Sequence, residues 1–189
     1  MASITSGVSD EGHFIEGSRI YLRGVCPDDV DARYHRWMND PEVTRFLESR
    51  FVPKTQSELR DFVVDLIGSV HAVFLAIVLK ENGTHIGNIK LGNIDWIHRF
   101  ADVGLLIGEK DCWAKGYATE AIKLATEYAF GTLNLGRLTA GFYSANTGSL
   151  RAFEKAGWER EGVQKLHYFC EGGYVDRISM AANRSDRRQ

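Results

Sequence analysis

Residues 111–121 read Asp-Cys-Trp-Ala-Lys-Gly-Tyr-Ala-Thr-Glu-Ala, and the rest of the chain is organised around this stretch. A strand-like run at 101–107 stops just before it, and an apolar helical pattern at 118–133 begins inside it. The first N–H groups of a helix have no partner within the helix, and the helix dipole adds partial positive charge there. Gly116 lets an anion approach the backbone because it has no Cβ, and Lys115 adds a full positive charge. This order of strand, glycine turn and helix predicts a phosphate or pyrophosphate site.

The same turn also fits a plain helix start that carries a surface lysine. The sequence contains neither the Gly-x-Gly-x-x-Gly of a dinucleotide-binding Rossmann fold nor the Gly-Lys-Ser/Thr of a Walker A loop. The absence of these two motifs excludes two familiar phosphate-binding loops and narrows the ligands that the turn is expected to hold.

The composition is that of an ordinary globular protein, since 44% of the 189 residues are hydrophobic and 25% are charged. We expect one domain at 14–182 between flexible tails at 1–13 and 183–189. The net charge of −2 gives no reason to expect nucleic acid or an acidic membrane surface as a partner. No apolar run approaches the length of a membrane span.

The three cysteines, Cys26, Cys112 and Cys170, are odd in number and share no metal-ligand spacing. Because the N-terminus carries no secretory signal, we interpret them as free thiols in a reducing compartment. The sequence therefore predicts a cytoplasmic protein without a metal site.

Hydrophobic periodicity predicts an α+β domain with a mixed sheet. A strand is expected at each of 19–23, 71–79, 85–94, 101–107, 138–143, 158–170 and 174–182. A helix is expected from Pro27 through Met38 and at each of 41–47, 55–67, 118–133 and 146–156. The residues at 82–83, Asn-Gly, predict a tight hairpin between the second and third strands. The strand at 138–143 should run parallel to the one at 101–107, because a helix connects them.

Three motifs resemble those of the GNAT superfamily of N-acetyltransferases. Residues 113–118 are similar to its acetyl-CoA loop, Gln/Arg-x-x-Gly-x-Gly/Ala, with Trp113 where Gln or Arg is usual. Residues 101–104, Ala-Asp-Val-Gly, resemble the Ala-Glu-Ile-Gly strand of the family's Rim-type branch. The enzymes of this branch resemble the N-terminal alanine acetyltransferases of ribosomal proteins. Residues 146–158 resemble that branch's Asn-x-x-Ser-x-x-x-x-Glu-Lys-x-Gly-Phe signature. The resemblance extends from about residue 17 to residue 182.

The resemblance implies a GNAT-like fold, a mixed and mostly antiparallel central sheet with helices on both faces and a splay between the two middle strands. It also implies that acetyl-CoA binds as the acetyl donor, with its pyrophosphate on the turn and its pantetheine arm between residues 105–107 and 138–143. Backbone N–H groups in the splay would polarise the thioester carbonyl. The residues assigned to the acetyl-CoA site are Leu105, Leu106, Ile107, Trp113, Ala114, Lys115, Gly116, Tyr117, Ala118, Thr119, Asn146, Ser149, Phe153 and Lys155.

An amine acceptor must attack as a neutral base, although an alkyl ammonium with a pKa near ~10 is almost fully charged at neutral pH. Asp102 is the candidate that accepts the proton, because it aligns with the family's strand glutamate. Aspartate is one methylene shorter than glutamate, which favours a relaying water. The alternative interpretation is a strand-edge charge that faces solvent.

The leaving thiolate also needs a partner. Many GNAT enzymes place a tyrosine just before the Glu-Lys pair, but this chain has Phe153, which has no proton to give. Ser149 is the candidate that replaces it, since the Rim-type branch carries serine there. The alternative is that Ser149 only caps its own helix. We expect Asn146 to cap that helix and to bond the pantetheine arm.

The residues expected to contact the acceptor are Trp37, Arg50, His85 and Tyr143. Trp37 begins the run at 37–43, Trp-Met-Asn-Asp-Pro-Glu-Val, which resembles the region that covers the acceptor in the Rim-type branch. Arg50 and Glu48 fit a loop that borders the substrate. They fit equally well an ordinary loop in which both charged side chains are solvated. Tyr143, His85 and His98 rank lower, because a lone histidine or tyrosine on a strand is more often structural.

We expect a small-molecule or peptide amine as acceptor, and a monomer or homodimer. One acceptor class is a protein N-terminus, as the Rim-type resemblance suggests. The other is a small amine such as a nucleotide-linked amino sugar, which the run at 39–51 favours weakly. A third possibility is a non-catalytic sensor module that binds acyl-CoA, and Phe153 in place of tyrosine keeps that alternative open.

Overall fold

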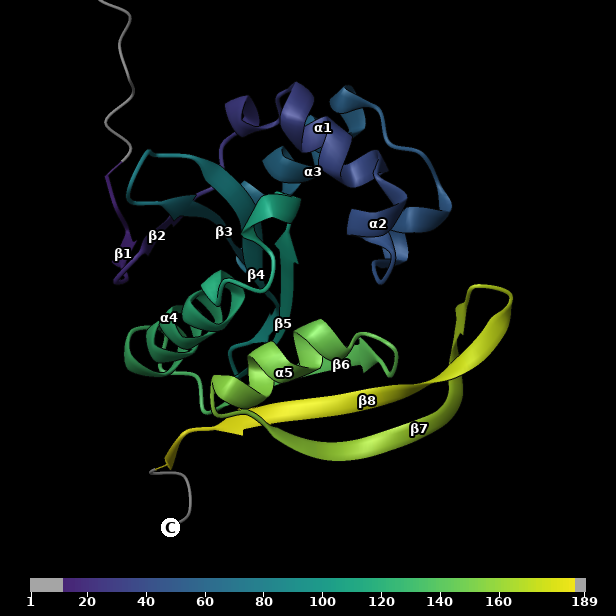
Figure 1. Ribbon diagram of the computed structural model, residues 1–189. Helices are drawn as coiled ribbons and strands as arrows, with labels where there is room; N and C mark the ends of the chain where they lie inside the picture. The colour runs from purple at the N-terminus through teal and green to yellow at the C-terminus, as the bar shows by residue number, and fades with distance from the viewer. Residues whose placement is uncertain (1–11, 186–189) are drawn as a thin grey trace, which may run out of the picture.

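One mixed, mostly antiparallel sheet runs through the computed structural model, which describes residues 12–185 (Figure 1). Its strand order is β1-β2-β3-β4-β5-β6-β8-β7, and only β5 and β6 pair in parallel. The strands are β1 (Ile15–Glu16), β2 (Ile20–Gly24), β3 (Val73–Leu79), β4 (His85–Asp95), β5 (Phe100–Ile107), β6 (Arg137–Tyr143), β7 (Glu159–Cys170) and β8 (Gly173–Asn183). The predicted α+β architecture is confirmed.

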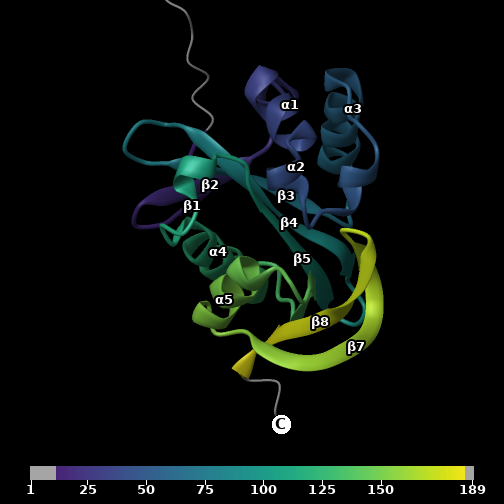
Figure 2. The same cartoon turned by 45° about the vertical axis from the view of Figure 1, so that its right-hand side comes forward.

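Helices cover both faces of this sheet, as predicted (Figures 1 and 2). The helical segments are η1 (Pro27–Asp29), α1 (Ala32–Asn39), α2 (Pro41–Thr44), η2 (Glu48–Phe51), α3 (Gln56–Ile67), η3 (Lys110–Cys112), α4 (Tyr117–Gly131) and α5 (Thr147–Lys155). Helices α1 and α3 pack on one face, against Ala76 and Val78 of β3. Helices α4 and α5 share the larger core on the other face, where Ala121, Ile122 and Ala125 turn the apolar side of α4 to the sheet.

The two middle strands separate after a short parallel contact. Strands β5 and β6 pair only where residues 100–102 meet residues 137–139. Beyond that point β5 stays bonded to β4 as far as the Ile107–Gly87 pair, and β6 stays bonded to β8 as far as the Tyr143–Arg177 pair. The facing edges of β5 and β6 are therefore open to an extended ligand, and the predicted splay is confirmed.

The helix expected from Pro27 through Met38 is two elements. Asp29 turns its carboxylate back to the amide of Cys26 at 2.9 Å, which closes the single turn η1. Asp31 then begins α1 anew, since its side chain accepts a hydrogen bond of 2.8 Å from the amide of Tyr34. An aspartate that can cap a helix resets the helix start, and the periodicity alone did not reveal this break.

The folded part extends slightly beyond the expected domain at both ends. His13 stacks on Tyr21, with ring centroids 3.7 Å apart. At the other end β8 includes Asn183, and the amide of Arg184 donates to the carbonyl oxygen of Gly136 at 3.1 Å. The remaining positions of the two expected tails, 1–11 and 186–189, lie outside the described residues. No helix within residues 12–185 is long and apolar enough to cross a membrane.

Candidate active site

The turn between β5 and α4 presents unpartnered backbone donors. Ala114 has φ +58° and Gly116 has φ +87°, so two left-handed residues bend the chain before α4 begins. Gly116 is the N-cap and supplies no side-chain cap to the helix. Within residues 12–185, no acceptor receives the amide N–H groups of residues 114–119. These amides, at the positive end of the α4 dipole, are free to bind an anion.

Two side chains, Arg19 and Glu120, hold this turn in place, and we call this pair the clamp. The Arg19 guanidinium donates to the Lys115 carbonyl oxygen at 2.8 Å and lies 4.8 Å from the centre of the Tyr117 ring. The Glu120 carboxylate accepts from the Arg19 amide at 2.8 Å and from Arg19 Nε at 3.1 Å. Burial opposes ionisation of Glu120, but hydrogen bonds from Arg19 and Ile20 outweigh it and lower the pKa of this carboxyl. The clamp uses carbonyl and carboxylate acceptors, and so leaves the amides of the turn available.

The other residues predicted for the pyrophosphate lie around these amides. Trp113 donates its indole N–H to the Ile107 carbonyl oxygen at 2.8 Å, so it closes the end of β5 instead of offering that donor to a ligand. Lys115 is exposed and has no ion pair within the described part of the chain. Ala118 and Thr119 form the first turn of α4. The charge and the free donors of this turn fit a pyrophosphate.

The start of α5 lies directly after β6, on the far side of the splay from residues 105–107. The amide of Asn146 donates to the Tyr143 carbonyl oxygen at 2.9 Å, and the Asn146 side chain accepts from the Ser149 amide at 3.2 Å. The helix cap is therefore Asn146, as predicted. Ser149 is half-buried, and its hydroxyl bonds to no described residue, so the capping alternative for that hydroxyl has no support.

Two residues predicted for the acetyl-CoA site stand apart from it. Phe153 is 1% exposed and packs edge-on against Phe142 and Trp158, each at 4.8 Å between ring centroids. Its ring supports α5 from the core and is not available to a ligand. Lys155 is exposed at the other end of α5, about 13 Å along the helix axis from Asn146.

Asp102 lies on β5 at the last residue that pairs with β6 before the strands separate. Its carboxylate accepts from the Thr139 hydroxyl and from Asn93 Nδ2, the latter at 3.0 Å. The side chain remains exposed. Asp102 therefore lies at the closed end of the splay with a fixed orientation and with access for an amine or a relaying water.

Arg50 and Tyr143, both predicted to contact the acceptor, are brought together. Arg50 Nη1 donates to the Tyr143 hydroxyl at 2.8 Å, and that hydroxyl lies 3.4 Å from Glu48 Oε1. The Tyr143 ring also stacks on Tyr168 of β7, with centroids 4.2 Å apart. The η2 segment, the end of β6 and the β7–β8 hairpin thus meet at one place.

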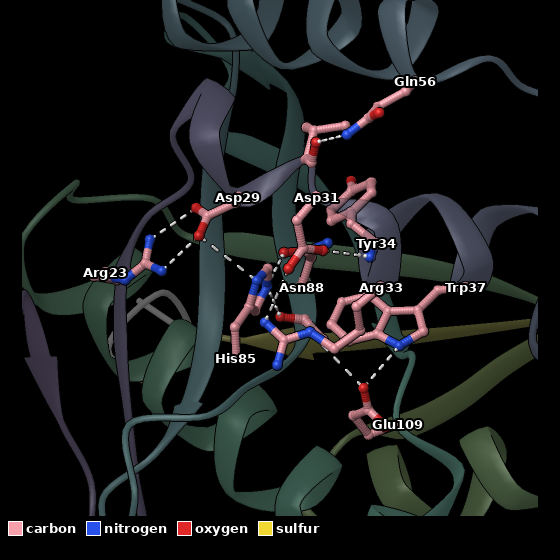
Figure 3. A network of polar contacts seen from close by, with 12 residues as sticks. Arg23, Asp29, Asp31, Arg33, Tyr34, Trp37, Gln56, His85, Asn88 and Glu109 are labelled. Atoms are coloured by element: carbon pink, nitrogen blue, oxygen red, sulfur yellow. Dashed lines mark hydrogen bonds and ion pairs between the residues drawn. The ribbon is translucent and has the colours of Figure 1, made fainter.

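Trp37 and His85 instead belong to a buried network under α1 (Figure 3). Trp37 is 2% exposed, donates to Glu109 Oε1 at 3.1 Å and lies against the backbone of Gly108, where an added Cβ would be 2.1 Å from the indole. His85 is 3% exposed, and its Nε2 bonds the Gly87 carbonyl oxygen and Asn88 Oδ1, both at 2.9 Å. Both side chains are almost fully buried and support the fold in this structure.

The pKa of His85 is lowered by burial, which outweighs the opposing effect of Asp29, 3.7 Å from its Nδ1. That Nδ1 is buried without a hydrogen-bond partner in the described residues. The neutral imidazole therefore carries its proton on Nε2. His98, a lower-ranked candidate, lies in the β4–β5 turn, where its amide bonds Asp95 at 2.7 Å.

A family profile described as "Acetyltransferase (GNAT) domain" matches residues 19–159 of this chain. The chain belongs to the GNAT acetyltransferase family. The uncharacterized N-acetyltransferase p20 of Bacillus licheniformis is 30% identical over 162 residues, which cover 84% of this chain and 89% of that relative. This GNAT protein is an acetyl-CoA-dependent N-acetyltransferase.

Solved structures share the fold. The spermidine N-acetyltransferase from Vibrio cholerae, in complex with CoA and spermine, has a TM-score of 0.80 at 23% identity, over 88% of this chain and 96% of that one. RimJ of Mycobacterium smegmatis, in complex with CoA-disulfide, has a TM-score of 0.78 at 19% identity, over 93% of this chain and 89% of that one. A Rim-type enzyme is thus among the solved structures that share the fold, in agreement with the resemblance of the sequence motifs to that branch.

The sequence did not point to Arg19 or to Glu120 as residues that hold the turn before α4. Glu120 lies within the quoted stretch, and its position in the first turn of α4 was a usable signal for an acid near a helix start. Arg19 offered no comparable signal, because it is 96 residues from the carbonyl it holds.

Proposed function

We propose that this GNAT enzyme transfers the acetyl group of acetyl-CoA by direct attack to a primary amine, which belongs to a small molecule or to a protein N-terminus. The observation that carries the proposal is the set of free amides at 114–119, beside the open end of the β5–β6 splay. When bound there, the donor supplies an activated thioester. The chain must position this thioester, accept the proton of the amine and stabilise the charge that develops on the carbonyl oxygen and on the sulfur.

Asp102 accepts the proton of the ammonium, directly or through one water, so that the neutral amine attacks the acetyl carbon. The open backbone edge at residues 105–107 supplies donors to the carbonyl oxygen as charge develops on it. The new C–N bond forms and the C–S bond breaks, and the second proton that the nitrogen loses passes through water to the departing thiolate, so that CoA leaves as its thiol. The Ser149 hydroxyl then donates a hydrogen bond to the departing sulfur. Each role uses a group whose placement is described above, at the closed end of the splay or beside its far edge.

The acceptor class remains open between three candidates. A nucleotide-linked amino sugar and a protein N-terminus follow from the sequence motifs. Relatives that are named as spermidine acetyltransferases add polyamines. A non-catalytic acyl-CoA sensor is the alternative that Phe153 in place of tyrosine left open, and it loses that support because the Phe153 ring is buried in the core. The cytoplasmic location and the monomeric or homodimeric state stay predictions.

A thiol-release assay with acetyl-CoA and a panel of amines tests the proposal. The panel contains glucosamine 1-phosphate, spermidine, a peptide with an N-terminal alanine, and leucine. We expect one class to release CoA at least a hundredfold faster than the amine-free background. Binding of acetyl-CoA without release by any amine supports the sensor instead. Asp102→Asn is the matched variant, because it keeps the side-chain shape and removes the base.

A further inference from the structure

Arg50 is held with part of its donor capacity unused. A guanidinium has five N–H donors. Three of them go to the Leu47 carbonyl oxygen at 3.0 Å, the Tyr143 hydroxyl at 2.8 Å and the Phe169 carbonyl oxygen at 2.7 Å. The ring of Phe51 also lies 4.1 Å from the guanidinium carbon. These contacts fix the orientation of the group and leave two donors, the number that an oxyanion takes in a two-pronged pair with arginine.

The charge of Arg50 is also unpaired. Within residues 12–185, no carboxylate lies within 4.0 Å of its guanidinium nitrogens. Arg45, in the same region, is paired with Glu171 at 2.8 Å, so an acid that is available locally serves the other arginine. The buried hydroxyl of Ser49, next to Arg50 in η2, has no hydrogen-bond partner in the described residues either. Native structures rarely leave a buried hydroxyl without a partner, so the Ser49 hydroxyl adds a second unused polar group beside Arg50.

Arg50 lines a cavity of about 280 Å³ between α1, α2 and the loop after η2. It is the charged member of the described lining. The other lining residues are the apolar Met38, Pro41, Val52 and Pro53 and the polar Asn39 and Thr44. Such a cavity suits an apolar body that carries one negative group. A polyamine would instead bring several positive charges toward this guanidinium.

Glu48 contacts the hydroxyl of the same tyrosine. The Tyr143 hydroxyl accepts from Arg50 and lies 3.4 Å from Glu48 Oε1, so it contacts one positive and one negative side chain. The carbonyl of Tyr143 bonds the first residue of the α5 cap, which connects this point to the splay. A molecule with an oxyanion at this point would meet the positive charge of Arg50.

We propose that the acceptor is an amine that carries an oxyanion, a carboxylate or a phosphate, and that Arg50 binds this group. The inference rests on the proposed function and narrows its acceptor class. Arg50 is then the residue that separates anionic acceptors from polyamines and from uncharged amines.

Calorimetry with two pairs of acetylated product analogues tests the assignment in the presence of saturating CoA. Each pair consists of an anionic compound and its uncharged counterpart, which we call its twin. One pair is N-acetyl-L-leucine and N-acetyl-L-leucinamide, and the other is N-acetylglucosamine 1-phosphate and N-acetylglucosamine. We expect one anionic member to bind at least tenfold more tightly than its uncharged twin, and the pair that shows this difference distinguishes a carboxylate from a phosphate. Equal binding within both pairs, or binding by neither pair, overturns the proposal.

Arg50→Gln should abolish the preference for the anionic twin and leave the Kd of CoA within about twofold. The matched control is Arg45→Gln, which removes the same charge from an arginine that is already paired, and it should keep the preference. Arg50→Lys keeps the charge without the two-pronged geometry and should keep part of the preference, which provides a second variant if the first folds poorly. Equal losses in the Arg45 and Arg50 variants would show a general charge effect and would also overturn the proposal.

The two proposals fail separately. These binding measurements require no turnover, so a protein that prefers the anionic twin but releases no thiol with any amine contradicts only the proposed catalysis. A protein that acetylates spermidine as fast as leucine or glucosamine 1-phosphate, with no preference between the twins, contradicts only the role of Arg50.

Discussion

Arg19 donates a hydrogen bond of 2.8 Å to the carbonyl oxygen of Lys115, 96 residues further along the chain. The same side chain pairs with Glu120 in the first turn of α4. The turn before α4 is thus fixed by its carbonyl and by a side chain, while its amides stay free. Donors that are held in place before the ligand arrives bind it with a smaller loss of conformational entropy.

Arg19→Met should weaken CoA binding about tenfold. A hydrogen bond from a charged donor contributes roughly 1.5–3 kcal/mol, and each ~1.4 kcal/mol corresponds to tenfold in Kd. Calorimetric titration with CoA measures the change. Arg60→Met removes an exposed arginine from α3, on the other face of the sheet, and serves as the control. An unchanged Kd in the Arg19 variant would mean that the turn holds its shape without the clamp.

Gly116→Asp should reduce CoA affinity by more than Gly116→Asn does. Both substitutions force a side chain onto φ +87° and bring a Cβ to about the 3.2 Å separation from Arg19 Nη2, so both carry the same steric cost. Only aspartate adds a negative charge that repels a pyrophosphate. Calorimetry at low and high salt separates the two effects, since the charge effect shrinks with screening. Equal affinities in the two variants would argue against a phosphate at this turn.

Local signals in the sequence predicted local structure well. The Thr55–Glu58 capping box forms as expected, with the Glu58 carboxylate 2.7 Å from the Thr55 amide. The hairpin after β3 has Gly83 at φ +68°, as an Asn-Gly pair suggests. These features depend on residues that are close in the chain, so their physical cause is visible in the sequence. The splay could be predicted only through the family resemblance. Nothing in the sequence of β5 or β6 indicates that the two strands stop pairing partway along their length.

Burial was the property that sequence reasoning judged least well. Trp37 and His85 were predicted to contact the acceptor, but both face inward, because α1 turns its aromatic side to β3 and β4. The same residue types suit a ligand pocket and a core. Phe153 is a similar case, since its ring completes an aromatic cluster with Phe142 and Trp158. Which side of an amphipathic element meets the core depends on contacts across the fold.

Stability should fall as the pH is lowered from 7.5 to 5.5, because of His85. An unfolded histidine has a pKa near ~6.5, and burial lowers the pKa of His85 in the folded state. The unfolded chain therefore binds more protons in this window, and stability present above about pH 6.5 is lost below it, by at most ~1.4 kcal/mol per pH unit for one proton. Urea unfolding at several pH values measures the slope.

His85→Gln should flatten that slope even if it lowers stability at every pH, since glutamine does not titrate. His167→Gln, which replaces an exposed histidine on β7, is the control and should keep the slope. A slope that survives in the His85 variant would assign the pH dependence to other groups.

Asp102→Asn should slow turnover more at pH 7 than at pH 9.5. An amine with a pKa near ~10 is roughly one part in a thousand neutral at pH 7, so it needs a base there and much less near its own pKa. General-base catalysis contributes about 10²–10⁴-fold, which bounds the loss at neutral pH. The pH profile of kcat/KM is the measurement, with Thr139→Val as the control, because it removes a donor to the carboxylate and keeps the base. An equal loss at every pH would make Asp102 a structural residue of the β5–β6 junction.

Ser149→Ala should lower kcat several-fold to about a hundredfold, with little change in CoA affinity. A thiol has a pKa of roughly 8.5, so its thiolate needs only modest help to depart at neutral pH. One hydroxyl can supply that help through a hydrogen bond, of about 1 kcal/mol to a neutral group and more to an anion. The Ser149 hydroxyl is free for this role, because Asn146 already caps α5 through the Ser149 amide.

Steady-state kinetics of Ser149→Ala beside Phe153→Tyr decides between a side-chain donor and water. The tyrosine variant should not raise kcat, since residue 153 points into the aromatic core and its hydroxyl would be buried away from the splay. A gain in kcat with tyrosine would show that position 153 can reach the sulfur. Full kcat in the alanine variant, with chemistry shown to be rate-limiting by single-turnover measurements, would mean that the thiolate departs through solvent.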